Sequence, residues 1–86
     1  MPYIEKEIRD TLSPTLNAIS EKIHTVGTLN YAITELCLNF VTKSAITYTS
    51  LNEIVGVLES AKLEFYRRAV STYEDKKIDS NGDVYK

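Results

Sequence analysis

Five basic and aromatic side chains lie close together on one predicted helix, which runs from Leu51 to Asp75. They are Lys62, Tyr66, Arg67, Arg68 and Tyr73. Arginine and lysine side chains bind phosphates, and a tyrosine ring stacks on a base or on a cation. This combination predicts a ligand-binding site for a small, anionic, nucleotide-derived molecule. Sequestering such a molecule requires affinity and no chemistry, so no cofactor is expected.

Each of these side chains also has an ordinary structural role available. Lys62 can pair with Glu59, three residues earlier, or extend past its apolar neighbours to solvent. Glu64 and Arg68 are four residues apart, which is the spacing of a common helix ion pair. A tyrosine at the edge of a core keeps its hydroxyl in water. The alternative prediction is therefore a structural or interaction protein that oligomerises or docks on another protein and takes no small ligand.

Catalysis has little support in the sequence. His24 is the only histidine and Cys37 the only cysteine, and they fall on different predicted helices. Cys37 lies within an apolar stripe, where a cysteine usually behaves as an inert small hydrophobic residue. His24 lies near a predicted helix end, where the helix dipole favours a positive charge. We therefore predict that the protein is not an enzyme and has no catalytic residue.

The acidic residues do not match a known metal-binding pattern. Glu7 and Asp10 have the three-residue spacing with which all-helical nucleotide pyrophosphatases hold magnesium, but the second carboxylate pair of such a site is missing. Between Asp79 and Asp83, Gly82 is the fourth residue, whereas the glycine of an EF-hand loop is the sixth. No metal ligand is predicted, and these acids are expected to be solvated surface groups.

The overall charge argues against a nucleic-acid coat. Ten Lys and Arg residues against twelve Asp and Glu residues give a net charge of -2. Proteins that neutralise many phosphates usually carry a clear excess of cations, so we expect no nucleic-acid partner despite the local group of Arg67, Arg68, Lys76 and Lys77. The sequence has neither the long apolar run of a membrane span nor the layout of a signal peptide. We expect a cytoplasmic protein without membrane contact.

Three or four helices must position these residues. We expect the first helix to run from Ile4 to about Leu12. Ser13 is a suitable N-cap and Pro14 a suitable first residue for a second helix, which should run to about Thr25 and end at Gly27. Thr28 can then cap a third helix from Leu29 to Thr42.

The long helix follows a predicted linker. Ile46, Thr47 and Tyr48 are β-branched or aromatic and favour an extended segment, while Ser50 and Glu53 have the spacing of a capping box. After Asp75 the chain becomes polar, with an Asn-Gly turn signal. We predict a helical domain of residues 1–75 and a tail of residues 76–86 that forms a hairpin, an arm on a neighbouring subunit or a frayed end.

The long helix has more apolar surface than a small single domain can cover. Leu51, Ile54, Leu58, Ala61, Phe65 and Ala69 fall on one line at about 100° per residue. Val57, Leu63 and Val70 fall outside it. Because an 86-residue chain buries only a modest core, we predict an all-α protein, a small helical bundle with a long C-terminal helix, that shares its core with other copies in a homo-oligomer.

Four segments of the sequence are distinctive, namely Leu29–Thr34, Leu63–Arg68, Tyr73–Ile78 and Asn81–Tyr85. Together they resemble those of a family of very short uncharacterised proteins from phages and prophage-bearing bacteria. The resemblance covers nearly the whole chain and implies a phage or prophage origin. It favours a structural accessory protein that docks on a host or phage protein, a host-takeover factor, or an inhibitor of host defence such as a sponge that sequesters immune messengers. It carries no catalytic residue over to this chain.

Overall fold

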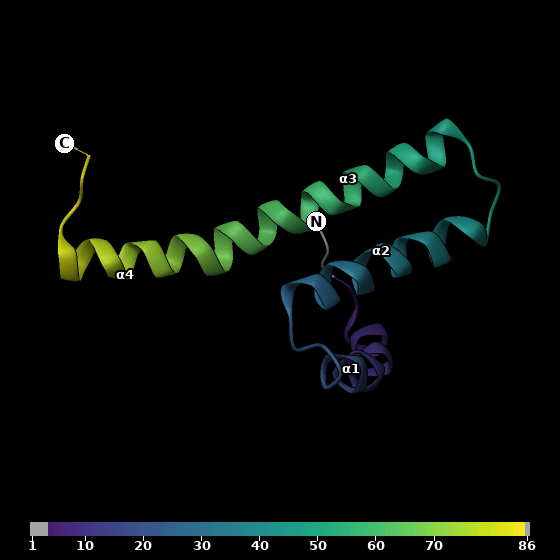
Figure 1. The fold of residues 1–86 in the computed structure, drawn as a ribbon, viewed down its shortest axis with the longest axis horizontal. Helices are drawn as coiled ribbons and strands as arrows, with labels where there is room; N and C mark the ends of the chain where they lie inside the picture. The colour runs from purple at the N-terminus through teal and green to yellow at the C-terminus, as the bar shows by residue number, and fades with distance from the viewer. Residues whose placement is uncertain (1–3, 86) are drawn as a thin grey trace. The chain divides into compact units, whose positions relative to one another are not determined.

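The computed structural model describes residues 4–85, in which all regular secondary structure is helical and no strand occurs (Figure 1). Its elements are α1 (Lys6–Ser20), α2 (Val26–Thr42) and a C-terminal helix of 34 residues that consists of α3 (Tyr48–Phe65), η1 (Tyr66–Val70) and α4 (Ser71–Asn81). The chain divides into two compact units, Met1–Ile46 and Thr47–Lys86. The all-α class and the long C-terminal helix are thereby confirmed, whereas a separate domain of residues 1–75 stays a prediction.

The first unit begins with a single helix where the sequence predicted two. α1 continues through Pro14, and Ser13 does not begin a new helix. The reason is the position of Pro14, which lies on the opposite side of α1 from Ile8, Leu12 and Ile19 at about 100° per residue. The carbonyl that loses its helical hydrogen bond to Pro14 therefore faces water, which lowers the cost of an internal proline.

α2, which the sequence predicted as a third helix starting at Leu29, begins earlier, at Val26. Thr25, with extended backbone, is the N-cap of α2, and its Oγ1 accepts a hydrogen bond from the N–H of Thr28 at 3.1 Å. Gly27 is consequently in the first turn of α2 and does not end the preceding helix. The predicted cap at Thr28 was displaced because Thr25 offers the same hydroxyl chemistry three residues earlier.

The long helix also begins earlier, at a different capping box. The Thr47 hydroxyl accepts from the N–H of Ser50 at 3.1 Å, and the Ser50 hydroxyl accepts from the N–H of Thr47 at 2.9 Å. Ser50 is thus the third residue of the helix and not its cap, so its pairing with Glu53 was wrong. Thr47 keeps the predicted extended backbone, while Tyr48 is already helical.

The five residues of η1 form a π-helical turn inside the long helix. A π turn closes hydrogen bonds between residues five apart instead of four, so it holds one residue more than an α turn. This extra residue turns the rest of the helix back by about 100°. Val70 and Tyr73 thereby come to within about 40° of the line through Leu58 and Phe65, although the sequence placed Val70 outside it. We call Leu51, Ile54, Leu58, Phe65, Val70 and Tyr73 the apolar stripe.

The C-terminal segment is helical beyond the predicted end at Asp75. α4 continues to Asn81, and Gly82 ends it with a positive φ of 87°. The predicted hairpin is therefore wrong, because residues 76–81 belong to the helix. The Asn-Gly signal does mark a real turn, since Gly82 adopts a left-handed backbone that most other residues avoid.

Most apolar side chains of the described residues are exposed. Over residues 4–85, Val41 of α2 is the only buried hydrophobic residue, with 4% of its surface exposed. Large exposed side chains occur on α1, α2 and the long helix alike, for example Ile8, Leu36 and Phe65. Each unit therefore presents amphipathic faces that it does not cover by itself. No helix within residues 4–85 is both long and apolar enough to cross a membrane.

Candidate functional site

The five predicted ligand-binding residues lie around the π turn. Lys62 is in the last turn of α3, Tyr66, Arg67 and Arg68 are the first three residues of η1, and Tyr73 is in the first turn of α4. At about 1.5 Å per residue they span about 16 Å along one side and the flanks of the helix. The π turn therefore falls at the centre of the group.

Glu64 holds both arginines. The Arg67 Nη2 donates to the two Glu64 carboxylate oxygens at 3.0 and 2.8 Å, and the Arg68 Nε donates to Oε1 at 3.1 Å. The Glu64 side chain is only 20% exposed, whereas those of Arg67 and Arg68 are 64% and 58% exposed. The predicted pair of Glu64 and Arg68 is confirmed, and the two guanidinium groups are held side by side around one carboxylate.

Lys62 pairs with Glu59, as the structural alternative predicted. The Lys62 Nζ lies 3.3 Å from the Glu59 Oε2, and both side chains are exposed. An exposed ion pair of this kind contributes at most about 1 kcal/mol. Lys62 can therefore exchange this partner for another anion at little cost.

Tyr66 reaches across the π turn to α4. Its hydroxyl donates a long hydrogen bond of 3.4 Å to the Glu74 Oε1, eight residues later. In an uninterrupted α-helix, residues eight apart point about 80° away from each other, but the extra residue of η1 reduces this to about 20°. The contact is thus a product of the π turn, and the sequence could not have predicted it.

Tyr73 has a cation against its ring. The Lys77 Nζ lies 5.6 Å from the centroid of the Tyr73 ring, within the range of a cation–π contact. The two residues are four apart, so this pair was visible in the sequence and was missed. The ring face that a base could stack on is thereby shared with an ammonium group, which would favour an anionic ligand.

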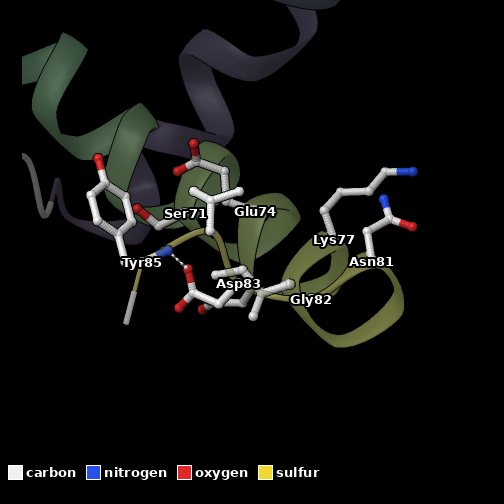
Figure 2. Close-up of a pocket in the computed structure, with 10 residues that line it drawn as sticks. Ser71, Glu74, Lys77, Asn81, Gly82, Asp83 and Tyr85 are labelled. Carbon is white, nitrogen blue, oxygen red and sulfur yellow. Dashed lines mark hydrogen bonds between the residues drawn. The ribbon is translucent and has the colours of Figure 1, made fainter.

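A groove on α4 lies beside the predicted residues and contains none of them (Figure 2). It has a volume of about 470 Å³ and is lined by Ser71, Glu74, Asp75, Lys77, Ile78, Asn81, Gly82, Asp83, Val84 and Tyr85. The segment after Gly82 forms its outer edge, where the Asp83 Oδ1 accepts a hydrogen bond from the Tyr85 N–H at 2.9 Å. Three carboxylates against one ammonium group make this groove unsuitable for an anion.

The residues considered for catalysis or metal binding lie on separate elements of the described chain. His24 is exposed in the loop between α1 and α2, and Cys37 is half-buried in α2. Asp10 is exposed and pairs with Lys6 at 2.9 Å. Over residues 4–85, no group of three or more His, Cys, Asp or Glu side chains could hold a metal ion.

Comparison with known proteins gives a family and no activity. No curated protein and no solved structure matches the chain. The comparison with protein families matches residues 1–84 to the family described as "Domain of unknown function (DUF6899)". Because this match covers nearly the whole chain, the protein belongs to that family.

Proposed function

We propose that the protein is an interaction protein that completes its hydrophobic core by packing against other chains, first of all copies of itself. The observation that carries this proposal is the burial of Val41 alone among the hydrophobic residues of the described part, while most large apolar side chains of α1 and the long helix are exposed. Exposed apolar faces of this extent mark interaction surfaces in soluble proteins.

The energetics of the long helix support association. Isolated helices are marginal in water, and most helix stability in proteins comes from packing of the apolar face. Leu58 and Phe65 on the apolar stripe are 41% and 66% exposed, and burial of such a side chain contributes about 1.5–3 kcal/mol when it is complete. A second chain on this stripe would supply what the unit Thr47–Lys86 lacks.

Sedimentation velocity of the purified protein over a range of concentrations tests this proposal. We expect an oligomer at micromolar concentration and a loss of helical circular dichroism when dilution separates the subunits. The Leu58→Glu variant should be monomeric or less helical, because a carboxylate within an apolar contact must be desolvated. Ser60→Glu, on the opposite side of the helix, is the matched control and should associate like the wild type. A stable, helical wild-type monomer at all concentrations would overturn the proposal.

A second candidate function is sequestration of a small, anionic, nucleotide-derived signal of host defence by a phage-encoded protein in the host cytoplasm. The observation that favours it is the coincidence of the π turn with Tyr66, Arg67 and Arg68, because π turns are frequent at functional sites. A phosphate could replace Glu64 between the two guanidinium groups, and the bond to such a group is stronger than a neutral hydrogen bond. The tyrosine rings would then stack on the base.

Thermal stabilisation by a ligand panel tests this second candidate. The panel contains cyclic di- and trinucleotides, ADP-ribose derivatives and ordinary nucleotides, since a ligand that binds only the native state raises its stability. A melting temperature raised by one class of ligand in the wild type, and not in Arg67→Ala, would support sequestration. If no member changes the melting temperature at a concentration well above the expected Kd, this candidate fails and the interaction protein stands alone.

A further inference from the structure

Glu64 occupies the place that an anionic ligand between the two arginines would need. Its carboxylate accepts hydrogen bonds from the Arg67 Nη2 at 3.0 and 2.8 Å and from the Arg68 Nε at 3.1 Å. The Glu64 side chain is only 20% exposed, whereas both arginine side chains are more than half exposed. A ligand can therefore reach both guanidinium groups from solvent, but it must take over hydrogen bonds that Glu64 accepts.

This charged group lies outside the apolar stripe. At about 100° per residue, Glu64 points about 100° away from Phe65 and about 120° away from Leu58. Glu64 precedes the π turn, so the extra residue of η1 does not change these angles. A second chain packed on the apolar stripe would leave Glu64 and its two arginines accessible. Anion binding here is therefore compatible with self-association.

Displacement of Glu64 sets a requirement on the charge of the ligand. A phosphodiester has a single negative charge shared by two terminal oxygens, as the Glu64 carboxylate has, so exchanging one for the other gains no charge and no acceptor. Glu64 is also tethered to the helix and therefore competes at a high effective concentration. A terminal phosphate carries a charge of about −1.5 to −2 at pH 7 and three acceptor oxygens. It can gain over Glu64 where a phosphodiester cannot.

We propose that Glu64 is an intramolecular competitor at the anion site, and that the site therefore binds a terminal, dianionic phosphate and not a phosphodiester. This inference rests on the proposed sequestration of a nucleotide-derived molecule and names its ligand class. Arg67 and Arg68 bind the phosphate oxygens, and Glu64 turns to solvent. Because Glu64 must leave before any anion binds, it weakens all anions by the same factor and sets the affinity that a ligand must exceed. Nucleotides with a terminal phosphate meet this requirement, whereas cyclic nucleotides, whose phosphates are diesters, do not.

Calorimetric titration with AMP and with 3′,5′-cyclic AMP tests the inference, because the two nucleotides share base and sugar and differ in phosphate charge. At about 0.1 M salt, charges more than about 10 Å apart are largely screened. The wild type should bind AMP more tightly than cyclic AMP by about tenfold or more. Glu64→Gln should tighten the binding of both nucleotides by a similar factor, about three- to tenfold.

Glu53→Gln is the matched control for Glu64→Gln. It removes the same charge from an exposed side chain of α3, about 17 Å away along the helix. Either affinity should then change by about twofold or less, because a charge at this distance is screened. Circular dichroism shows whether each variant keeps the helicity of the wild type, and the comparison of the two nucleotides in the wild type depends on no variant.

Equal affinity of the wild type for AMP and cyclic AMP would overturn the inference and leave sequestration intact. An AMP affinity that Glu64→Gln leaves unchanged or lowers would also overturn it, because Glu64 would then position the arginines and would not compete with the ligand. If AMP binds neither the wild type nor Glu64→Gln, the inference fails. Sequestration fails with it only if the whole ligand panel leaves the melting temperature unchanged.

Discussion

The π turn at η1 can be tested by changing the length of the helix by one residue. Deleting Ala69 removes the extra residue and allows an uninterrupted α-helix in which Val70 and Tyr73 keep their alignment with Phe65. Inserting one alanine after Ala69 instead adds a second extra residue. The part of the helix after the insertion then turns by about 100° unless a second strained turn forms. We therefore expect the deletion to leave association nearly unchanged and the insertion to weaken it, although each changes the helix by one residue.

The magnitude follows from the side chains that the insertion misplaces. Val70 is half-buried and Tyr73 is 60% exposed, so each can gain about half of the 1.5–3 kcal/mol of complete burial when a second chain covers the stripe, roughly 1 kcal/mol. Two such side chains from each of two copies contribute about 4 kcal/mol to a dimer. Even half of that value raises the Kd by about 30-fold. The deletion should change Kd by about threefold or less, because it leaves both side chains on the stripe.

Sedimentation equilibrium provides the Kd of both variants, and circular dichroism shows whether each remains helical. The deletion variant should also keep the hydrogen bond between Tyr66 and Glu74. In an α-helix that is one residue shorter, these two residues point in nearly the same direction, as they do across the π turn. If η1 were an ordinary α turn in solution, Val70 would lie about 120° from Leu58 in the wild type, and deletion of Ala69 would bring it onto the apolar stripe and lower the Kd. A dimer that is clearly tighter in the deletion variant than in the wild type would therefore refute the π-turn reasoning.

The remaining predictions concern the stripe, the tail, the cap and the arginines. Val57→Glu and Val70→Glu should each give monomers or lower helicity, as light scattering and circular dichroism would show, and Val70→Glu should have the larger effect because only Val70 lies on the apolar stripe. Removing residues 83–86 should weaken association if Val84 and Tyr85, which are 88% and 84% exposed, pack on a neighbouring copy, whereas an unchanged mass and melting temperature would show a dispensable tail. Thr47→Ala should lower the free energy of unfolding by about 0.5–2 kcal/mol through loss of the cap, as measured in urea, while Thr49→Ala should not. Arg67→Ala and Arg68→Ala should each weaken calorimetric binding of a phosphate-bearing ligand by about 1.5–3 kcal/mol and leave the melting temperature of the free protein unchanged, with Lys6→Ala as a control that should bind like the wild type.

Helical periodicity allowed the fold class to be predicted, whereas the residues at which the helices begin and end were harder to predict. Leu16, Ile19 and Ile23, and later Leu51, Ile54 and Leu58, repeat every three or four residues, which only a helix accommodates on one face. The ends depend on single hydroxyl groups, and this chain has several threonines and serines near each end that compete for the same role. Thr25 replaced Thr28 and Thr47 replaced Ser50 for this reason.

The π turn could not be predicted, because no residue type marks it. A sequence pattern gives the angle between two residues only when every turn holds the same number of residues. The prediction therefore placed Val70 outside the stripe and gave no reason to connect Tyr66 with Glu74. The ion pairs on either side of η1 were predictable, since Glu59 with Lys62 and Glu64 with Arg68 each lie within one α turn.

The two proposed functions share Tyr73 but otherwise depend on different residues of the same helix, so mutations at the other positions can separate them. Association depends on the apolar stripe, including Leu58 and Phe65, whereas anion binding depends on the guanidinium groups that Glu64 holds on the flank. A small phosphate-bearing molecule that bound an associated form more tightly than the monomer would, by linkage, strengthen association by the same factor. Self-association is therefore the property to measure first, because ligand binding can be interpreted only when the state of the protein that binds the ligand is known.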